Sequence, residues 1–460
     1  MAKGDICSKP EEMMKDKSFG IIGAGLVGSL LALMLSRRGF TVDVFERRSD
    51  PRIAGNDGGR SINLALSDRG LQALEHAGLK EEVRQLCIPM HGRMVHDQSG
   101  DVRFMPYGKE GQFINSVSRG GLNTLLLNHA VKHENVRIHF GKKCEDSDIL
   151  RASTFTDSEV SPHTFDILFG TDGAYSATRL NLMKTDRFDF SYRQDYLDHG
   201  YKELTIPASE KGGWRLESNA LHIWPRKSFM MIALPNLDGS FTCTLFLAMN
   251  GEISFEHLTD KGSVTGFFKT YFSDAVPHMP TLTEDFFSNP TSSLVTMYCD
   301  PWYYKDKLLL MGDAAHAVVP FYGQGMNAGF EDCYILEGLI DKYSEDWGRI
   351  FGSFYEERKP NTDAIAELAL RNFIEMRDLV ADPHFILKNK IDKKIASLYP
   401  DHWMPLYSMV TFSKIPYSEA LRLGNEHDRI LESIVEKEKN IEMLLESGEF
   451  DKVIRPYIKY

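Results

Sequence analysis

The fold of this chain is decided by the stretch SFGIIGAGLVGSLLALMLSRRGFTVDVFERR, residues 18–48. Its apolar residues Phe19 to Ile22 predict a buried strand, which ends at the pattern Gly23-x-Gly25-x-x-Gly28. A helix over Leu26 to Arg37 and a second strand over Thr41 to Phe45 are expected next. Strand, glycine turn, helix and strand in this order are typical of a βαβ unit that binds a dinucleotide.

The three glycines and the acid after the second strand each have a physical task. Gly23 permits the tight turn, Gly25 lets backbone N–H groups approach a pyrophosphate, and Gly28 allows the helix to pack closely on the strand. Glu46, about 20 residues on, can accept hydrogen bonds from the adenosine ribose. One such unit suits NAD or FAD, so this stretch predicts a dinucleotide without choosing between the two.

A second stretch, LLLMGDAAHAVVPFYGQG from Leu308 to Gly325, bears on that choice. Its apolar start predicts another buried strand, which stops at Gly312-Asp313. A carboxylate where a helix begins repels phosphate, because helix N-termini themselves attract anions. A ligand with hydroxyl groups, or a ring that carries donors, is the better match for Asp313.

Composition limits the class of protein. The chain has 460 residues, 42% hydrophobic and 26% charged, as in ordinary soluble proteins of two or three domains. A formal net charge of -12 argues against a nucleic-acid partner. The six cysteines are scattered without a C-x-x-C pair, which favours a reducing compartment. Residues 1–17 fit no targeting signal and are expected to be a disordered leader.

Three motifs together resemble the fingerprints of a known family, the FAD-dependent aromatic hydroxylases, which are single-component flavoprotein monooxygenases. They are G-x-G-x-x-G at 23–28, D-G-x-x-S-x-x-R at 172–179 and GDAAHAVVPFYGQGMN at 312–327. The resemblance implies FAD as the cofactor, with Asp313 on its ribityl hydroxyls, and NADPH as a transient co-substrate. The blocks GRSINLALSDRG, IPMHGRMVHD, LHIWPR, FMMIALPN, GQGMNAGFEDC, RNFIEMR and PLYSMVTFS extend it from about residue 19 to about 420. They indicate one branch of the family, whose substrate is an aromatic ketone with an amino-acid tail.

The expected fold class is α/β, a Rossmann-like FAD-binding domain with an inserted antiparallel sheet and a C-terminal helical region. We place the FAD-binding domain at 18–190 and 301–360, the antiparallel substrate domain at 191–300, and the helical region that closes the substrate site at 361–460. The charged segment from Glu419 to Glu449 is expected to be a solvated helix; a membrane-surface or partner helix is the alternative. No apolar run approaches the roughly 20 residues that span a bilayer, so we expect a soluble, cytoplasmic protein. Eukaryotic members of the branch resemble outer-mitochondrial-membrane proteins with an apolar C-terminal anchor, a segment that the end of this chain does not show.

The resemblance also implies which residues contact the cofactor. Asp172 and Arg179 are tied by it to FAD and NADPH handling, and the helix from about Gly325 offers N–H groups to the pyrimidine edge of the flavin. The expected cofactor residues are Gly23, Gly25, Val27, Gly28, Glu46, Arg47, Ala65, Arg119, Asp172, Arg179, Asp313, Pro320, Gly323, Gly325, Met326 and Asn327.

An amino-acid tail needs a cation for its carboxylate and an acceptor for its ammonium. Arg93 and Tyr107 lie on an expected hairpin whose turn is 97–100, and they match the carboxylate-binding pair of the family. Asn372 and Glu375 are three residues apart, so they share one helix face. The resemblance places Asn372 at the substrate and makes Glu375 a partner for the ammonium.

Aromatic residues are expected to form the walls of the same site. The resemblance places Tyr407 at the substrate, and Phe321 and Tyr322 between the substrate ring and the flavin. Position 322 is tyrosine where the family leads us to expect phenylalanine.

The predicted activity is NADPH- and O2-dependent hydroxylation of an aromatic ring by a monomer or homodimer. His316 is expected to have a structural or flavin-side role, and His129 and His133 lack the third ligand of a metal site. Two alternatives remain: another FAD-dependent hydroxylase or flavin dehydrogenase, and a non-catalytic binding protein on a related fold. Substrate-stimulated NADPH oxidation tests the first, and a colourless preparation that FAD does not reconstitute would favour the second.

Overall fold

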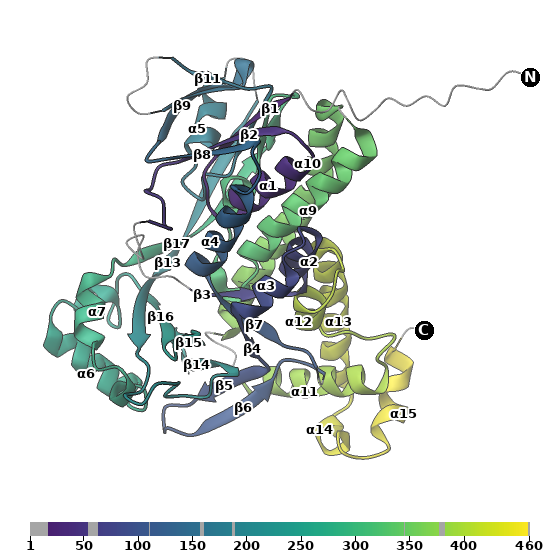
Figure 1. Ribbon diagram of the computed structural model, residues 1–460. Helices are drawn as coiled ribbons and strands as arrows, with labels where there is room; N and C mark the ends of the chain where they lie inside the picture. Colours follow the sequence, from purple (N-terminus) through teal and green to yellow (C-terminus); the bar gives the residue numbers. More distant parts are fainter. Residues whose placement is uncertain are drawn as a thin grey trace, which may run out of the picture.

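The computed structural model describes residues 17–53, 63–109, 111–156, 161–185, 189–344, 346–376 and 382–458. The expected leader lies outside these ranges except for Lys17, and so do the first four residues of the GRSINLALSDRG block. Figure 1 shows an α/β part at the top, a second sheet below it, and C-terminal helices along the right-hand side. Two long helices, α9 (Gly325–Tyr343) and α10 (Trp347–Ile374), lie between these parts.

The upper part is built on a six-stranded sheet in the order β18-β19-β12-β1-β2-β8. All neighbouring strands pair in parallel except the edge strand β18. The strands are β1 (Ser18–Ile22), β2 (Thr41–Glu46), β8 (Val136–Phe140), β12 (Ile167–Gly170), β18 (Tyr303–Tyr304) and β19 (Leu308–Leu310). Since β19 follows the second sheet in sequence and returns beside β12, the α/β part is discontinuous, as the sequence predicts.

The elements around the first glycines agree with the sequence prediction. Helix α1 spans Leu26–Arg37, and β2 ends at Glu46. Gly23 has φ +103, a backbone conformation that favours glycine. Leu30, Leu31 and their neighbours on α1 are buried against the sheet, which accounts for the apolar helix that the sequence shows.

The lower part is a seven-stranded sheet in the order β17-β13-β16-β15-β14-β5-β6. One face packs on helices α6 (Lys261–Tyr271) and α7 (Leu282–Ser288), and the other on α10 and the segment around Phe321. The strands are β5 (Gly92–His96), β6 (Val102–Pro106), β13 (Ser191–Ile206), β14 (Ala220–Arg226), β15 (Phe229–Pro235), β16 (Phe241–Ala248) and β17 (Ser292–Asp300).

The hairpin β5–β6 forms as predicted, with Asp97 at its turn. It pairs with β14, so the second sheet is not made of residues 191–300 alone. This pairing carries residues of the first segment to the substrate side of the molecule.

Shorter elements complete the two parts. Helix α2 (Asp68–His76) packs on α9, and α4 (Arg119–Ala130) packs on α1. The others are α3 (Lys80–Gln85), α5 (Ala177–Met183), α8 (Asp313–His316), η5 (Pro320–Tyr322), the sheet of β3 (Asn63–Leu66), β4 (Cys87–Met90) and β7 (Ile114–Ser118), and the sheet of β9 (Cys144–Asp148), β10 (Ser153–Thr156) and β11 (His163–Thr164).

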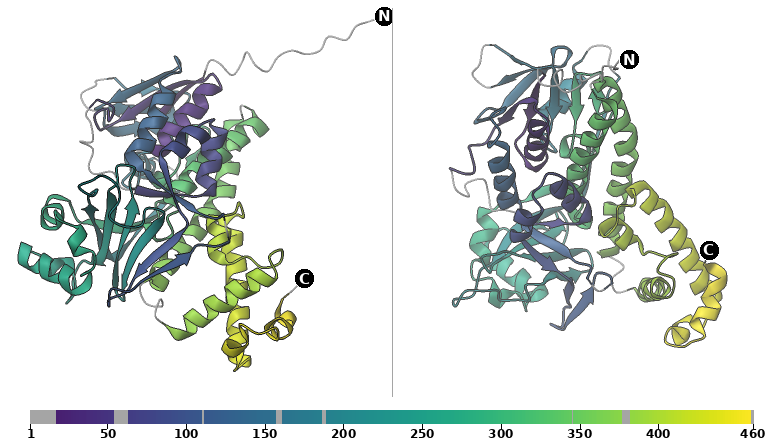
Figure 2. Two further views of the ribbon diagram at one scale, coloured as in Figure 1. Left: turned by 60° about the horizontal axis from the view of Figure 1, so that its bottom comes forward. Right: turned by 45° about the vertical axis from the view of Figure 1, so that its right-hand side comes forward.

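The C-terminal helices gather at one end of α10 (Figure 2). They are α11 (Pro383–Leu398), α12 (Leu406–Thr411), α13 (Tyr417–Lys437), α14 (Ile441–Leu444) and α15 (Phe450–Ile454). Pro360 lies inside α10, so the boundary that we placed after residue 360 falls within one helix. Helix α13 buries one face, including Tyr417 and Ile434, and leaves its charged face outward. Across the described ranges, no helix is long and apolar enough to cross a membrane.

Candidate active site

The nucleotide end of the site lies where β1 and β2 finish. A Cβ built on Gly25 would meet no atom within 4 Å, so the backbone at the start of α1 is open to a ligand. Glu46 accepts hydrogen bonds from Ala24 N at 3.0 Å and from Arg48 Nε at 2.8 Å. Burial alone would raise the pKa of Glu46, but the hydrogen bonds and charge of Arg48 outweigh it and hold that pKa below its usual value. An ionised acceptor beside open amide groups fits the ribose and pyrophosphate of a dinucleotide.

We expect Gly28→Ala to lose both flavin and stability. A Cβ at Gly28 would lie 2.0 Å from Gly23 O and 2.5 Å from Thr171 Oγ1, so α1 must move away from β1 at a cost of about 1–3 kcal/mol or more. Flavin absorbance per chain and the melting temperature measure the two effects. Gly25→Ala is the matched control, which should weaken FAD binding and leave the melting temperature of the apoprotein unchanged. Full flavin content and an unchanged melting temperature in Gly28→Ala would contradict this assignment.

Arg47 follows β2, and Arg119 begins α4; both residues are exposed. Val27 lies on the first turn of α1, and a Cβ on Gly312 would come within 2.9 Å of its side chain. The structure therefore brings the first and third motifs into contact.

The middle motif, residues 172–179, contacts the backbone of the loop that carries Asp313. Asp172 accepts hydrogen bonds from Ser176 Oγ at 2.5 Å and Thr178 N at 3.0 Å, and so fixes the start of α5. The buried guanidinium of Arg179 donates to Ala314 O at 2.7 Å, next to Asp313. Both side chains thus shape the Asp313 loop, and their direct contact with FAD or NADPH stays a prediction.

Asp313 begins α8, and its side chain is exposed. The backbone behind it is held by the buried Asp332, which accepts from Gly312 N at 3.0 Å and lies 2.6 Å from His316 Nε2. Arg358 Nε donates to the other oxygen of Asp332 at 2.7 Å. Burial alone would raise the pKa of Asp332, but His316 and Arg358 keep it below its usual value. A fixed loop with an outward carboxylate fits the ribityl hydroxyls of FAD.

This contact with Asp332 supports a structural role for His316, one of the two roles that the sequence predicts. Sequence reasoning missed Asp332 and Arg358. Their signal was weak, because an acid in GFEDC and an arginine in a helix resemble ordinary surface charges until the fold places them together.

The start of α9 is fixed by Asn327. Its Oδ1 accepts from Ser67 N at 2.9 Å, and its Nδ2 donates to Ala65 O at 2.8 Å and to Gly323 O at 2.9 Å. Gly323 has φ +65 and would clash with Ala65 if it carried a side chain larger than hydrogen. The amide of Asn327 is therefore used within the protein, and it holds Ala65 and Gly323 beside the helix start.

Pro320, Gly325 and Met326 belong to the same turn and first helical residues. Pro320 is exposed, and the other two are half-buried. Their contact with the flavin is a prediction that the position of the loop supports.

The substrate side is centred on Arg93 of β5. Its guanidinium carbon lies 5.2 Å from the ring centroid of Tyr107 and 4.9 Å from that of Tyr407. The two tyrosine rings stack at 5.6 Å, and Tyr322 stacks on Tyr407 at the same distance. Within the described ranges, Arg93 Nε is buried without a hydrogen-bond partner, and no carboxylate forms an ion pair with Arg93. Arg93 as a whole is half-buried, and a partly desolvated cation of this kind is costly unless an anion binds to it.

The end of α10 contributes the acceptor and fixes one wall. Asn372 Nδ2 donates to Phe321 O at 2.7 Å, and Phe321 stacks on Phe373 at 4.3 Å. Asn372 therefore positions the Phe321 loop, and its direct contact with a substrate stays a prediction. Burial raises the pKa of the half-buried Glu375, while Arg371, Lys388 and Arg93 oppose that rise. Glu375 acts electrostatically on both Arg93 and Tyr322.

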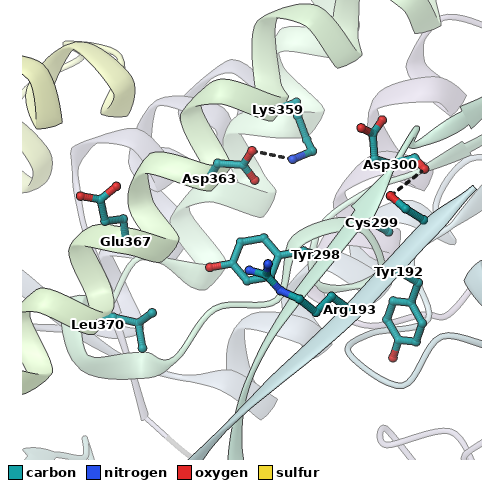
Figure 3. Close-up of a pocket in the computed structure, with 10 residues that line it drawn as sticks. Tyr192, Arg193, Tyr298, Cys299, Asp300, Lys359, Asp363, Glu367 and Leu370 are labelled. Atoms are coloured by element: carbon teal, nitrogen blue, oxygen red, sulfur yellow. Dashed lines mark hydrogen bonds and ion pairs between the residues drawn. The ribbon is translucent and has the colours of Figure 1, made fainter.

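A cavity of about 690 Å³ lies elsewhere, between α10 and the strands β13 and β17 (Figure 3). It contains none of the predicted site residues. Arg193 lies over the Tyr298 ring at 4.4 Å, and Lys359 is 2.5 Å from Asp363. Because its cations are already paired, it is a poorer receptor for a carboxylate than the Arg93 cluster.

His129, one of the two histidines for which the sequence predicts no metal site, lies against a carboxylate. His129 Nε2 lies 2.9 Å from Glu82, on the outside of α4. In the part of the chain that the structure describes, no group of three histidine, cysteine or acidic side chains could hold a metal ion.

Comparisons with known proteins identify the family. A family model described as "FAD binding domain" matches residues 17–368. Kynurenine 3-monooxygenase of Christiangramia forsetii is 47% identical over 451 residues, which is 97% of this chain and 100% of that protein. The Dictyostelium discoideum enzyme of the same name is 42% identical over 462 residues, covering 97% and 99%. The branch of the family that the sequence blocks indicate is thus confirmed.

Solved structures show the same fold. An oxygenase of 2-methyl-3-hydroxypyridine-5-carboxylic acid superposes with a TM-score of 0.64 at 18% identity, over 81% of this chain and 96% of that one. PqsL of P. aeruginosa, in complex with 2-aminobenzoylacetate, gives 0.64 at 18% identity, over 79% and 97%.

Proposed function

Because this chain belongs to the kynurenine 3-monooxygenase family of FAD-dependent monooxygenases, we propose that the Arg93 cluster binds L-kynurenine for hydroxylation to 3-hydroxykynurenine, with NADPH and O2 as co-substrates. FAD, when bound, accepts electrons from NADPH and activates O2. The chain's own residues bind the substrate, orient its ring and exclude water. The reaction belongs to tryptophan degradation and NAD biosynthesis.

The unpaired cation of Arg93 is the observation that carries the substrate assignment. Its planar guanidinium can bind a carboxylate through two parallel hydrogen bonds. The hydroxyls of Tyr107 and Tyr407 can add donors, and Glu375 can accept from the ammonium. Phe321 and Tyr322 then lie where the aromatic ring of the substrate enters the apolar part of the site.

The oligomeric state that the sequence analysis expects, a monomer or a homodimer, stays a prediction.

A substrate panel tests this function against other aromatic hydroxylases. NADPH oxidation by the flavin-loaded protein is measured with kynurenine and with aromatic acids that lack the amino-acid tail. We expect strong stimulation by kynurenine alone. Equal stimulation by a tailless acid would show that the Arg93 cluster does not select the substrate.

Glu375→Gln should raise the KM for kynurenine about tenfold, since an ammonium–carboxylate contact of about 1.5 kcal/mol is lost. Burial keeps the pKa of Glu375 above its usual value. In the wild type, the carboxylate is therefore lost, and KM rises, as pH falls through that raised pKa. The glutamine variant should lack this acid limb in steady-state assays. The same acid-side rise in both proteins would exclude Glu375 as the ammonium partner.

A further inference from the structure

A chain of polar side chains lies on the face of β5 opposite to Arg93. His96 Nδ1 is 2.7 Å from Asp274 Oδ2, and His96 Nε2 is 2.9 Å from His222 Nδ1. His222 Nε2 is 2.8 Å from the carbonyl oxygen of Glu217, and Trp224 Nε1 donates to Asp274 Oδ2 at 2.8 Å. His96, His222 and Trp224 are all buried, and the proposed catalytic site uses none of them.

The acceptors at the two ends of this chain fix its protons. A carbonyl oxygen only accepts, so His222 Nε2 carries a hydrogen and donates to Glu217. The remaining nitrogen of a neutral His222, Nδ1, is an acceptor, so His96 Nε2 must donate to it. An ionised Asp274 also only accepts, so His96 Nδ1 must donate as well. With a hydrogen on both nitrogens, His96 is an imidazolium cation.

The environment supports the two assumptions in that count. Burial lowers the pKa of His222 to about 4, so its ring is neutral at ordinary pH. Burial alone would raise the pKa of Asp274, but its hydrogen bonds from His96 and Trp224 hold it below its usual value. Asp274 is therefore ionised, and the buried His96 and the half-buried Asp274 form an ion pair.

Two other basic side chains lie near the pair, and neither can compensate the positive charge of His96. Arg226 donates to the carbonyl oxygens of His96 and Asp97, at 2.9 and 3.2 Å, and so straps the end of β5. Burial, and then the charge of Arg215, lower the pKa of His278, which lies beyond Asp274. Asp274 is thus the carboxylate that compensates the imidazolium among the described neighbours.

Strand β5 connects the ion pair to the proposed substrate site, because it carries both His96 and Arg93. Strand β5 lies next to the edge of its sheet, and all five residues of the outer strand β6 are exposed. Strand β5 is paired with β14 on its inner side and with the exposed edge strand β6 on the other. Asp274 follows α6, so its bond with His96 ties β5 to the helical layer behind the sheet. Arg93 lies three residues before His96 and points to the other face.

We propose that the His96–Asp274 ion pair is a positioning device for substrate binding, because it fixes β5 and with it the guanidinium of Arg93. His96 and Asp274 are positioning residues that touch neither substrate nor cofactor. The inference rests on the proposed role of Arg93 and adds a cause for its placement.

The test is Asp274→Asn in the flavin-loaded enzyme. Asp274 Oδ2 accepts hydrogen bonds from both His96 and Trp224. A neutral His96 that still donates from Nε2 would have an acceptor at Nδ1, whereas Trp224 needs an acceptor for its N–H. One amide group in the place of Oδ2 cannot donate to His96 and accept from Trp224 at the same time. We expect the KM for kynurenine to rise about tenfold at nearly constant kcat. The KM for the decarboxylated analogue of kynurenine, which has no use for Arg93, should stay within about twofold. Equal rises for both substrates, or no rise, would overturn the proposal.

A second variant tests the charge itself. His96→Gln combined with Asp274→Asn removes both charges of the pair, so the double variant should recover a KM within about threefold of wild type. No recovery would mean that His96 is not a cation. If Asp274→Asn does not fold, the double variant and His96→Gln alone decide the question. Asp101→Asn, at the exposed tip of the same hairpin, is the control and should change neither KM.

Failure here is separable from failure of the proposed function. If Arg93→Gln leaves the kynurenine KM unchanged, the substrate assignment itself is wrong. If Arg93→Gln raises it and Asp274→Asn does not, only the ion-pair proposal fails.

Discussion

Arg93→Gln should raise the KM for kynurenine about a hundredfold and leave FAD bound. A bidentate, charge-assisted contact in a buried site corresponds to about 3 kcal/mol, which is about a hundredfold in affinity. Arg93 lies between Tyr107 and Tyr407, away from the glycine motif and from Asp313, so flavin content should not change. Steady-state NADPH oxidation and flavin absorbance per chain measure the two quantities.

The control is chemical. The decarboxylated analogue should be turned over by Arg93→Gln and wild type with similar KM values, because it presents no carboxylate. Arg93→Lys keeps the charge and loses the planar guanidinium. Its KM for kynurenine should therefore lie between those of wild type and Arg93→Gln. An unchanged kynurenine KM in Arg93→Gln would remove the observation on which the substrate assignment rests.

Asp313→Ala should yield a colourless protein whose affinity for FAD is lower by about a hundredfold, a loss of about 2–3 kcal/mol of charge-assisted hydrogen bonding. Asp313 is exposed, and its loop is held from behind by Asp332, so the apoprotein should keep its melting temperature. Flavin titration followed by fluorescence gives the affinity, and Asp306→Ala, an exposed acid on the preceding turn, is the control.

Retention of flavin by Asp313→Ala would mean that the carboxylate does not meet the ribityl chain. Loss of flavin together with a lower melting temperature would indicate a structural role for Asp313 instead.

Elements with strong local signals could be predicted from the sequence. Helix α1 and strand β2 begin and end within a residue of the predicted positions, because glycines and apolar periodicity fix them locally. We placed a domain boundary after Pro360 because a proline usually ends a helix. Here Arg358 and Thr362, on either side of it, are buried, and tertiary packing stabilises the helix through the interruption.

Long-range contacts could not be predicted in the same way. The pairing of β5 with β14 joins strands from distant segments, and no local pattern encodes it. Likewise, no local pattern shows that the polar groups of Asn327 and Arg179 hold loops of the expected cofactor site; their direct contact with the cofactor stays a prediction. Arg93 became a specific candidate only through the family resemblance; the structure adds that the side chain is half-buried and that its Nε is buried without a hydrogen-bond partner among the described residues.

The most direct test of the account is kynurenine-dependent NADPH consumption with product analysis by mass spectrometry under labelled dioxygen. We expect NADPH to be consumed only when kynurenine is present. The expected product is 3-hydroxykynurenine that carries one labelled oxygen atom. NADPH consumption that kynurenine does not stimulate, or stimulation that returns kynurenine unchanged, would contradict the account.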